Sequence, residues 1–219
     1  YNHWTRWDFG GQFLNLSFNT NTHAWFKNNW NIGTGFNWIA LDISNNALRG
    51  GSSLRRQPGV NNWAYIETDS RKKLSFSLNT FVARGFGNTS RSQEFSGGIR
   101  YQPLDALSIG LYPGYSHSWR KQDQFVDQTG FEGALRTIVS EVDQHSFSLT
   151  TRINYNITPD LTVQYYAQPF IFRALYQNYG YVTDPLNTDF DKRFHRYDGV
   201  EIRQVDDVFE VDENRNGTP

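Results

Sequence analysis

The chain has 219 residues, and its 21 Lys and Arg against 22 Asp and Glu leave a formal net charge of -1. This balance gives no overall attraction to nucleic acid or to anionic lipid, so we expect no nucleic-acid partner. The sequence contains no cysteine, which excludes a disulfide framework and a thiolate metal site.

Aromatic residues make up 16% of the chain, a high share for an ordinary soluble domain. Mean hydropathy is nevertheless -0.66, and the sequence has no apolar run of the roughly 18 residues that a membrane-spanning helix needs. This combination is typical of a transmembrane barrel, in which only alternate strand residues face lipid. Because the chain begins at Tyr1 without a signal peptide, we expect a mature protein or a fragment of a longer one.

Apolar and polar residues alternate with a period of two along much of the chain, and this pattern predicts β-strands with one apolar and one polar face. Several runs persist for roughly 10 residues, the length of a tilted strand that crosses a bilayer. Strands of globular domains are nearer 5 or 6 residues. In chain order, the clearest runs cover residues 14–19, 32–40, 74–82, 107–118, 147–157 and 161–168.

The predicted connections alternate strictly between short and long. Tight turns at one rim and larger loops at the other are expected of a barrel, whereas a β-sandwich with Greek-key crossovers need not show them. The short connections lie near residues 19–27, 69–73, 103–106 and 158–160. The long ones cover residues 44–60, 85–91 and 120–136, and everything after Arg173.

The sequence therefore predicts an all-β fold, an antiparallel transmembrane β-barrel with about eight strands in this chain and part of a larger barrel. We expect the strands within residues 1–173, and a long extracellular loop, acidic and Asn/Gly-rich at its end, over residues 174–219. The alternative is a soluble barrel or sandwich with its polar face in water. That alternative needs a second set of strands to cover the apolar face.

In a barrel the apolar residues would face lipid and the polar ones the lumen. Arg100 and Arg152 should point inward, because an arginine that faces lipid at mid-bilayer costs about 2–4 kcal/mol. The predicted lumen-lining residues are Asn15, Asn37, Ser77, Asn79, Arg100, Arg152, Asn154, Gln164 and Gln168.

One segment carries a family resemblance. Residues 141–170, which begin Glu141-Val142-Asp143 and end Gln168-Pro169-Phe170, resemble the C-terminal barrel region of a Bacteroidota family of outer-membrane proteins of unknown function. Residues 26–30 and the motif at residues 48–51 also fit that family. In its members the barrel follows a carbohydrate-binding-type N-terminal domain, which we do not expect within these 219 residues. The resemblance implies a place in the bacterial outer membrane and contact with its lipid, and supplies no catalytic residues.

Two groups of residues suggest chemistry. Asp212, Asn214 and Asn216, followed by glycine, match the first half of a calcium loop, although an Asn-Gly turn explains the same letters. Calcium is thus the one cofactor suggested. The five histidines lack the spacing of a helical zinc site. His117 and His145 each adjoin serine, but neighbouring residues of a strand point to opposite faces.

These observations favour an outer-membrane barrel that acts as a scaffold, a pore or a subunit of a larger envelope complex, with no defined reaction. A first alternative is a glycan-binding or glycan-uptake component, suggested by the family's partner domain and by Tyr176, Tyr179 and Tyr181 in the last segment. A second alternative is a barrel hydrolase with Ser and His on neighbouring strands. Expected partners are outer-membrane lipid, other envelope proteins and glycans.

Overall fold

The computed structural model describes residues 1–131, 133–206, 208–215 and 217. The fold is all-β, with 71% of residues in strands and no α-helix in the part of the chain that is described. No helix there is long and apolar enough to span a membrane. The chain divides into two compact units. Unit one comprises Tyr1–Leu41, Pro58–Trp119 and Asp143–Leu175, and unit two comprises Asp42–Gln57, Arg120–Val142 and Tyr176–Pro219.

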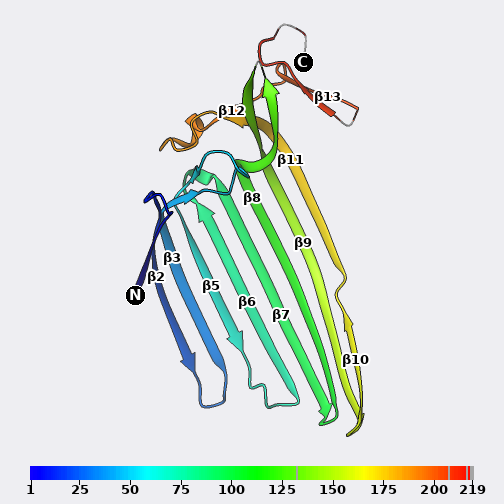
Figure 1. Cartoon of the computed structure of the whole chain (residues 1–219). Coiled ribbons are helices and arrows are strands. Elements are labelled where there is room, and N and C mark those ends of the chain that lie inside the picture. Colours follow the sequence, from blue (N-terminus) through cyan, green and yellow to red (C-terminus); the bar gives the residue numbers. More distant parts are fainter. Residues whose placement is uncertain (132, 207, 216, 218–219) are drawn as a thin grey trace. The chain divides into compact units, whose positions relative to one another are not determined.

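The main sheet is antiparallel and open, in the order β1-β2-β3-β5-β6-β7-β8-β9-β11-β12 (Figure 1). Its strands are β1 Asn2–Trp7, β2 Phe13–Trp25, β3 Asn31–Ser44, β4 Leu54–Arg56, β5 Gly59–Glu67, β6 Leu74–Gly85, β7 Ser90–Leu104, β8 Leu107–Phe131, β9 Ala134–Thr158, β10 Leu161–Ala167, β11 Phe170–Val182 and β12 Phe194–Arg196. β4 pairs with β3, and β10 pairs with β9. A separate hairpin joins β13 (Ile202–Val205) to β14 (Val208–Val211), and short 3-10 turns cover Phe86–Asn88 and Phe190–Lys192.

The predicted all-β, antiparallel fold is confirmed, and several boundaries differ from expectation. β2 continues to Trp25, and the turn closes where the Phe26 N–H donates to the Trp30 carbonyl at 2.8 Å. β8 and β9 run through most of the predicted loop 120–136. The expected loop after Arg173 contains the end of β11, β12 and the β13–β14 hairpin. Backbone pairing extends or forms these strands where the sequence shows no regular alternation of apolar and polar residues.

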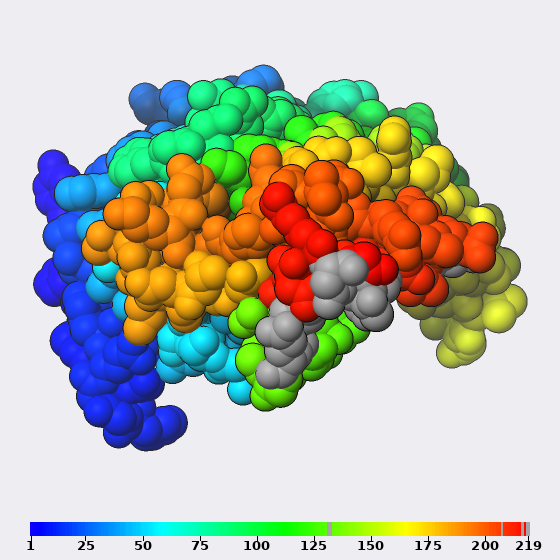
Figure 2. Space-filling view, turned by 90° about the horizontal axis from the view of Figure 1, so that it is seen from above, coloured from blue at the N-terminus to red at the C-terminus, as the bar shows by residue number. Residues whose placement is uncertain are grey.

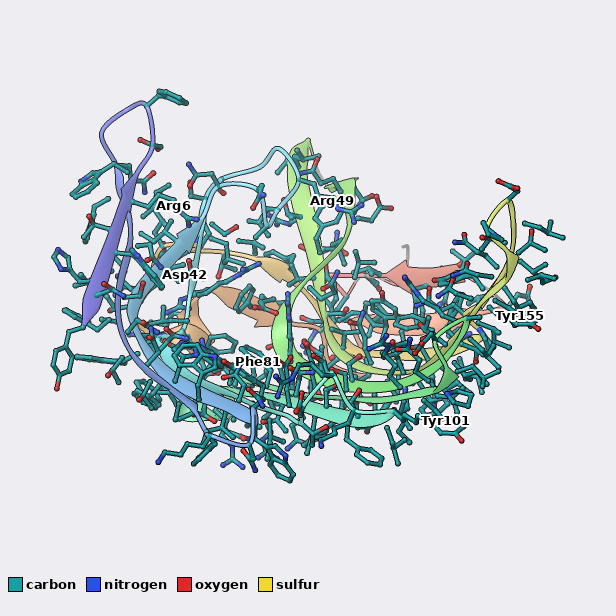
Figure 3. The ribbon with its side chains drawn as sticks, turned by 90° about the horizontal axis from the view of Figure 1, so that it is seen from below. Arg6, Asp42, Arg49, Phe81, Tyr101 and Tyr155 are labelled. Carbon is teal, nitrogen blue, oxygen red and sulfur yellow. The ribbon has the colours of Figure 1, made fainter. Side chains whose placement is uncertain are left out.

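The sheet of unit one has two chemically different faces. Leu78 lies opposite Ile66 and Gly97, whereas its neighbour Asn79 lies opposite Tyr65 and Ser96. One face therefore carries mostly apolar residues, and the other carries mostly polar residues together with the aromatic side chains of Trp63, Tyr65 and Phe81. Figure 3 shows Tyr101, from the apolar set, on the convex side of this curved sheet.

Unit one has almost no hydrophobic core. Among the described residues, Leu14 is its one buried hydrophobic side chain, and all the others lie in unit two. Leu74, Phe76 and Leu78 on β6 are between 46% and 48% exposed. Among the residues that the structure describes, no second layer of strands in unit one covers the apolar face of this sheet.

Unit two has a core of its own. Leu48, Leu54, Val139, Phe190 and Phe194 pack together, with Ala47 and Val182 against them. These apolar side chains are removed from water by one another, which is the ordinary arrangement of a hydrophobic core.

A buried arginine links segments around this core by hydrogen bonds. Arg193 is fully buried and donates hydrogen bonds to the carbonyls of Asn187 (2.6 Å), Arg55 (2.6 Å) and Thr188 (3.1 Å). Its guanidinium carbon lies 5.5 Å from the centre of the Phe190 ring. Burial lowers the pKa of Arg193. The side chain fastens the segment before β12 to β4.

We predict that Arg193→Ala destabilises unit two by about 3 kcal/mol, because three carbonyls lose a charged donor and the core loses a fully buried side chain. Amide hydrogen exchange should accelerate across residues 184–196. The control is Lys192→Ala, whose exposed ammonium lies 3.7 Å from Asp189 and should contribute less than about 1 kcal/mol. Equal exchange rates in the two variants would contradict the role assigned to Arg193.

Candidate functional site

The polar face of unit one carries a ladder of asparagines. Asn19 donates to Asn37, and Asn37 Nδ2 donates to Asn61 Oδ1 at 2.5 Å. Asn15 Nδ2 donates to the Leu41 carbonyl at 3.0 Å. An amide both donates and accepts, so the side chains of β2, β3 and β5 form a connected, uncharged hydrogen-bonded surface.

Arg100 anchors the same face near the short turns. Its guanidinium donates to Gln102 Oε1 (2.7 Å), to the Ser70 carbonyl (3.2 Å) and to Ser108 Oγ (3.3 Å). Together with Glu67 it lines a cavity of about 280 Å³. A second cavity, of about 270 Å³, is lined on this face by Asn79, Phe81, Glu94, Ser96, Ser116 and Ser146.

The structure places eight of the nine predicted lumen-lining residues on this polar face. Arg152 stacks over the Tyr166 ring at 5.3 Å, and Asn154 lies opposite Gln164. Gln168, the ninth, lies between β10 and β11, where its Oε1 accepts from the Tyr166 hydroxyl at 2.5 Å. The face offers hydroxyls, amides and a few charges, a surface suited to water and polar solutes.

The turn between β5 and β6 holds a well-formed ion pair. Asp69 accepts from the Arg71 side chain at 2.9 and 3.0 Å, and from the Arg71 backbone N–H at 3.0 Å. Asn29 Nδ2 donates a longer hydrogen bond, of 3.3 Å, to Asp69 Oδ2. The hydrogen bonds from Arg71 lower the pKa of Asp69 to about 2. Arg71 therefore helps to hold the conformation of this turn.

The sheet separates the serines from the histidines that precede or follow them. Ser116 and Ser146 line the polar-face cavity, whereas His117 and His145 lie on the apolar face together with Asp143. Sequence reasoning missed this grouping because its members come from two strands. The Asp143-x-His145 spacing, which puts two metal-ligating side chains on one face of a strand, is the signal that could have found it.

Unit two contains a larger, mainly apolar cavity of about 560 Å³. Tyr179 and Phe209 form one wall, with ring centres 4.7 Å apart. Tyr197 lines it too and donates to Glu213 Oε1 at 2.8 Å. Burial and the Glu213 carboxylate raise the pKa of Tyr197, which keeps its hydroxyl protonated. The last segment, which supplies most of these residues, is the orange-to-red surface of Figure 2.

The three tyrosines singled out in this segment have different surroundings. Tyr179 lines the cavity, and Tyr176 is exposed. Tyr181 lies beneath Arg136, whose guanidinium carbon is 4.5 Å from the ring centre. Arg136 also forms an ion pair with Glu213 at 3.1 Å. The Tyr181 ring is therefore packed against a side chain of the same unit.

The predicted calcium loop is a hydrogen-bonded turn in the described residues. Asp212 Oδ2 accepts from the Gly217 backbone N–H at 2.7 Å. Arg215 reaches back to Asp198 at 2.9 Å and to Glu201 at 3.4 Å. Asn214 precedes this arginine, and Asn216 lies outside the described residues. Calcium binding here stays a prediction.

The sequence profile of a family described as "Domain of unknown function (DUF5916)" matches residues 3–199. The chain belongs to the DUF5916 family. No curated protein matches the chain, and no solved structure does either. The DUF5916 description assigns no activity, so the roles of the residues in this member rest on its own geometry.

In this DUF5916 chain we predict that the stabilising effect of Asp69 depends on pH. Because the folded-state pKa is depressed from 3.8 to about 2, the contribution is complete above about pH 4 and is lost as the pH falls through 2. Melting temperatures of the wild type and Asp69→Asn should differ by a constant amount at neutral pH and converge near pH 2. Asp105→Asn, on the turn after β7, is the control for loss of charge alone. A difference that does not change with pH would refute the assignment.

Proposed function

We propose that the sheet of unit one is part of a transmembrane β-barrel in the bacterial outer membrane, with its apolar face against lipid and its polar face toward an aqueous lumen. The DUF5916 chain would then serve as a scaffold, a pore or a subunit of an envelope complex. The observation that carries this proposal is the exposed apolar face of a sheet that has almost no core of its own.

The dimensions of the apolar face support this proposal. On β9 the apolar set runs from Phe147 to Ile157. At roughly 3.3 Å per residue these 11 positions span about 33 Å along the strand. A strand tilted by about 40° would project some 25 Å onto the membrane normal, the height of the apolar band of an outer-membrane barrel.

The alternative covers for this face are less suitable. Contiguous apolar surface of this kind on a soluble protein promotes association, and exposed sheet edges add to that risk. Lipid covers an apolar face without demanding complementary side chains. Barrel strands also satisfy every backbone group within the sheet, as membrane insertion requires.

The open sheet supports a barrel larger than these strands. β1 forms one edge, and the interrupted strand made by β10 and β11 pairs with β9 near the other. Unpaired edges cannot persist in lipid, so further strands would have to close the sheet. The tight turns after β2, β5, β7 and β9 fit the short-turn rim of such barrels.

A matched pair of substitutions tests this proposal. Leu78→Arg places a cation on the apolar face at the middle of β6, and Asn79→Arg places the same cation on the polar face one residue away. If lipid covers the apolar face, Leu78→Arg should cost about 2–4 kcal/mol and sharply reduce folding into vesicles. Asn79→Arg should fold normally. Equal folding of the two variants, or a water-soluble monomeric wild type, would reject the barrel.

A second candidate function, glycan binding, is favoured by the unit-two cavity. Tyr179 and Phe209 offer apolar ring surface, and Asp127, Glu210 and Glu213 offer acceptors for sugar hydroxyls. The volume of this cavity, about 560 Å³, lies within the usual range of small-ligand pockets.

We predict that any oligosaccharide found by a glycan array to bind the whole chain binds at least tenfold more weakly to Tyr179→Ala. Loss of the aromatic wall removes both apolar contact and shape. Tyr176→Ala, an exposed tyrosine that does not line the cavity, is the control and should keep its affinity. No binding to any glycan, or equal loss in both variants, would remove this candidate.

A further inference from the structure

Three metal-ligating side chains converge on the apolar face of unit one, at neighbouring positions of β8 and β9. His117 Nε2 lies 2.8 Å from Asp143 Oδ1, and His145 Nε2 lies 3.3 Å from the same oxygen. One ligand atom from each residue lies within 4.8 Å of the others. We propose that His117, Asp143 and His145 bind one divalent transition cation of the zinc type.

The strand geometry explains why these residues meet. Asp143 and His145 are two positions apart on β9, so both side chains leave the same face. His117 comes from β8, where it follows Tyr115 at the same spacing, and Tyr115 Oη lies 3.1 Å from His145 Nδ1. The two imidazole rings are nearly parallel, with centres 4.2 Å apart and an interplanar angle of 7°. Parallel rings direct both Nε2 atoms toward one carboxylate.

The distances suit a small tetrahedral cation. Zinc bonds of about 2.0–2.1 Å to nitrogen and oxygen place adjacent ligand atoms about 3.3 Å apart. The His145–Asp143 separation of 3.3 Å already has this value. The His117–Asp143 separation of 2.8 Å would have to open by about half an ångström, a small side-chain rotation.

Tyr115 completes the arrangement from outside the ligand set. A cation on His145 Nε2 requires the proton of the neutral ring to sit on Nδ1, which faces Tyr115 Oη. The hydroxyl can accept that proton in a hydrogen bond and so orient the ring. Partners of this kind fix the tautomer of metal-ligating histidines and typically contribute 10- to 100-fold in affinity.

The donor set selects the kind of cation. Two imidazole nitrogens and one carboxylate oxygen suit zinc, copper or nickel, whereas calcium and magnesium prefer oxygen alone. The side chains of His117 and His145 are 27% and 43% exposed, so a cation can reach them. Three protein ligands leave a coordination position for water.

The site lies where the apolar stripe of each strand ends. On β8 the stripe that includes Leu111 and Tyr115 reaches His117, and on β9 the stripe that begins at Phe147 is preceded by His145. Polar ligands at this position remain accessible to water whether lipid or solvent covers the apolar residues. The cation site therefore does not depend on the proposed barrel.

The test uses the whole chain in detergent, stripped with a chelator and titrated with zinc chloride by isothermal titration calorimetry. We expect one equivalent bound with micromolar or tighter affinity, and at least tenfold weaker binding by His117→Ala, His145→Ala and Asp143→Asn. The matched control is His23→Ala. His23 is also a strand histidine beside a tyrosine hydroxyl, 3.0 Å from Tyr65, and its loss should leave zinc affinity unchanged.

Cobalt(II) titration of the wild type gives a readout that needs no variant. We expect the intense visible absorption of a four- or five-coordinate cobalt ion, displaced by zinc. Tyr115→Phe should weaken cobalt binding by about tenfold with the far-UV circular dichroism unchanged. Failure to bind zinc at millimolar concentration, a cobalt spectrum of the six-coordinate aquo ion, or equal affinity in His23→Ala and His145→Ala would overturn the proposal.

Discussion

A sheet with one apolar face must have that face covered, and in unit one the cover does not come from the unit itself. Each strand contributes an alternating set such as Leu74, Phe76 and Leu78, and these side chains stay about half exposed. Each fully exposed side chain of this size forgoes about 1.5–3 kcal/mol of hydrophobic stabilisation relative to burial. Strand length and the two-faced register are consistent with the proposed lipid cover, and the open edges would then have to be closed by further strands.

In unit two, by contrast, the apolar side chains are covered by one another. Its apolar side chains pack on one another around Leu54 and Val139, and its buried Arg193 is satisfied by three carbonyls. Charged groups there are arranged in pairs, such as Arg136 with Glu213 and Arg215 with Asp198. One chain thus contains one unit organised around an internal core and another organised around a surface.

The sequence was informative wherever side-chain alternation reports the environment directly. The opposite faces of Leu78 and Asn79, and the common face of Arg100 and Arg152, follow from the period of two alone. The sequence was less informative where backbone pairing alone determines whether a strand forms and where it ends. β1 is short and its flanking turn carries no alternation, and residues 20–23 are polar on both faces, so neither strand segment was expected.

Features that depend on register could not be predicted from one sequence. The grouping of His117 with Asp143 and His145 requires knowing which residues of β8 and β9 lie side by side. The unit-two cavity likewise depends on how the β13–β14 hairpin packs, and hydrophobic periodicity does not report it. For the asparagine ladder, the alternation of residues predicted which face of the sheet it occupies. The hydrogen-bond partners of each asparagine depend on register and could not be predicted.

Site-directed spin labelling tests the lipid-covered face most directly, and the absence of cysteine from the chain permits single-cysteine labels without a background. Labels placed one at a time at residues 75–81 of β6, in vesicles, would be probed with oxygen, which concentrates in lipid, and with a water-soluble nickel chelate. The account predicts a period of two, with Phe76, Leu78 and Thr80 accessible to oxygen and Ser77, Asn79 and Phe81 accessible to the chelate. Equal access of the chelate to both faces, or protection of the even positions from both probes, would contradict it.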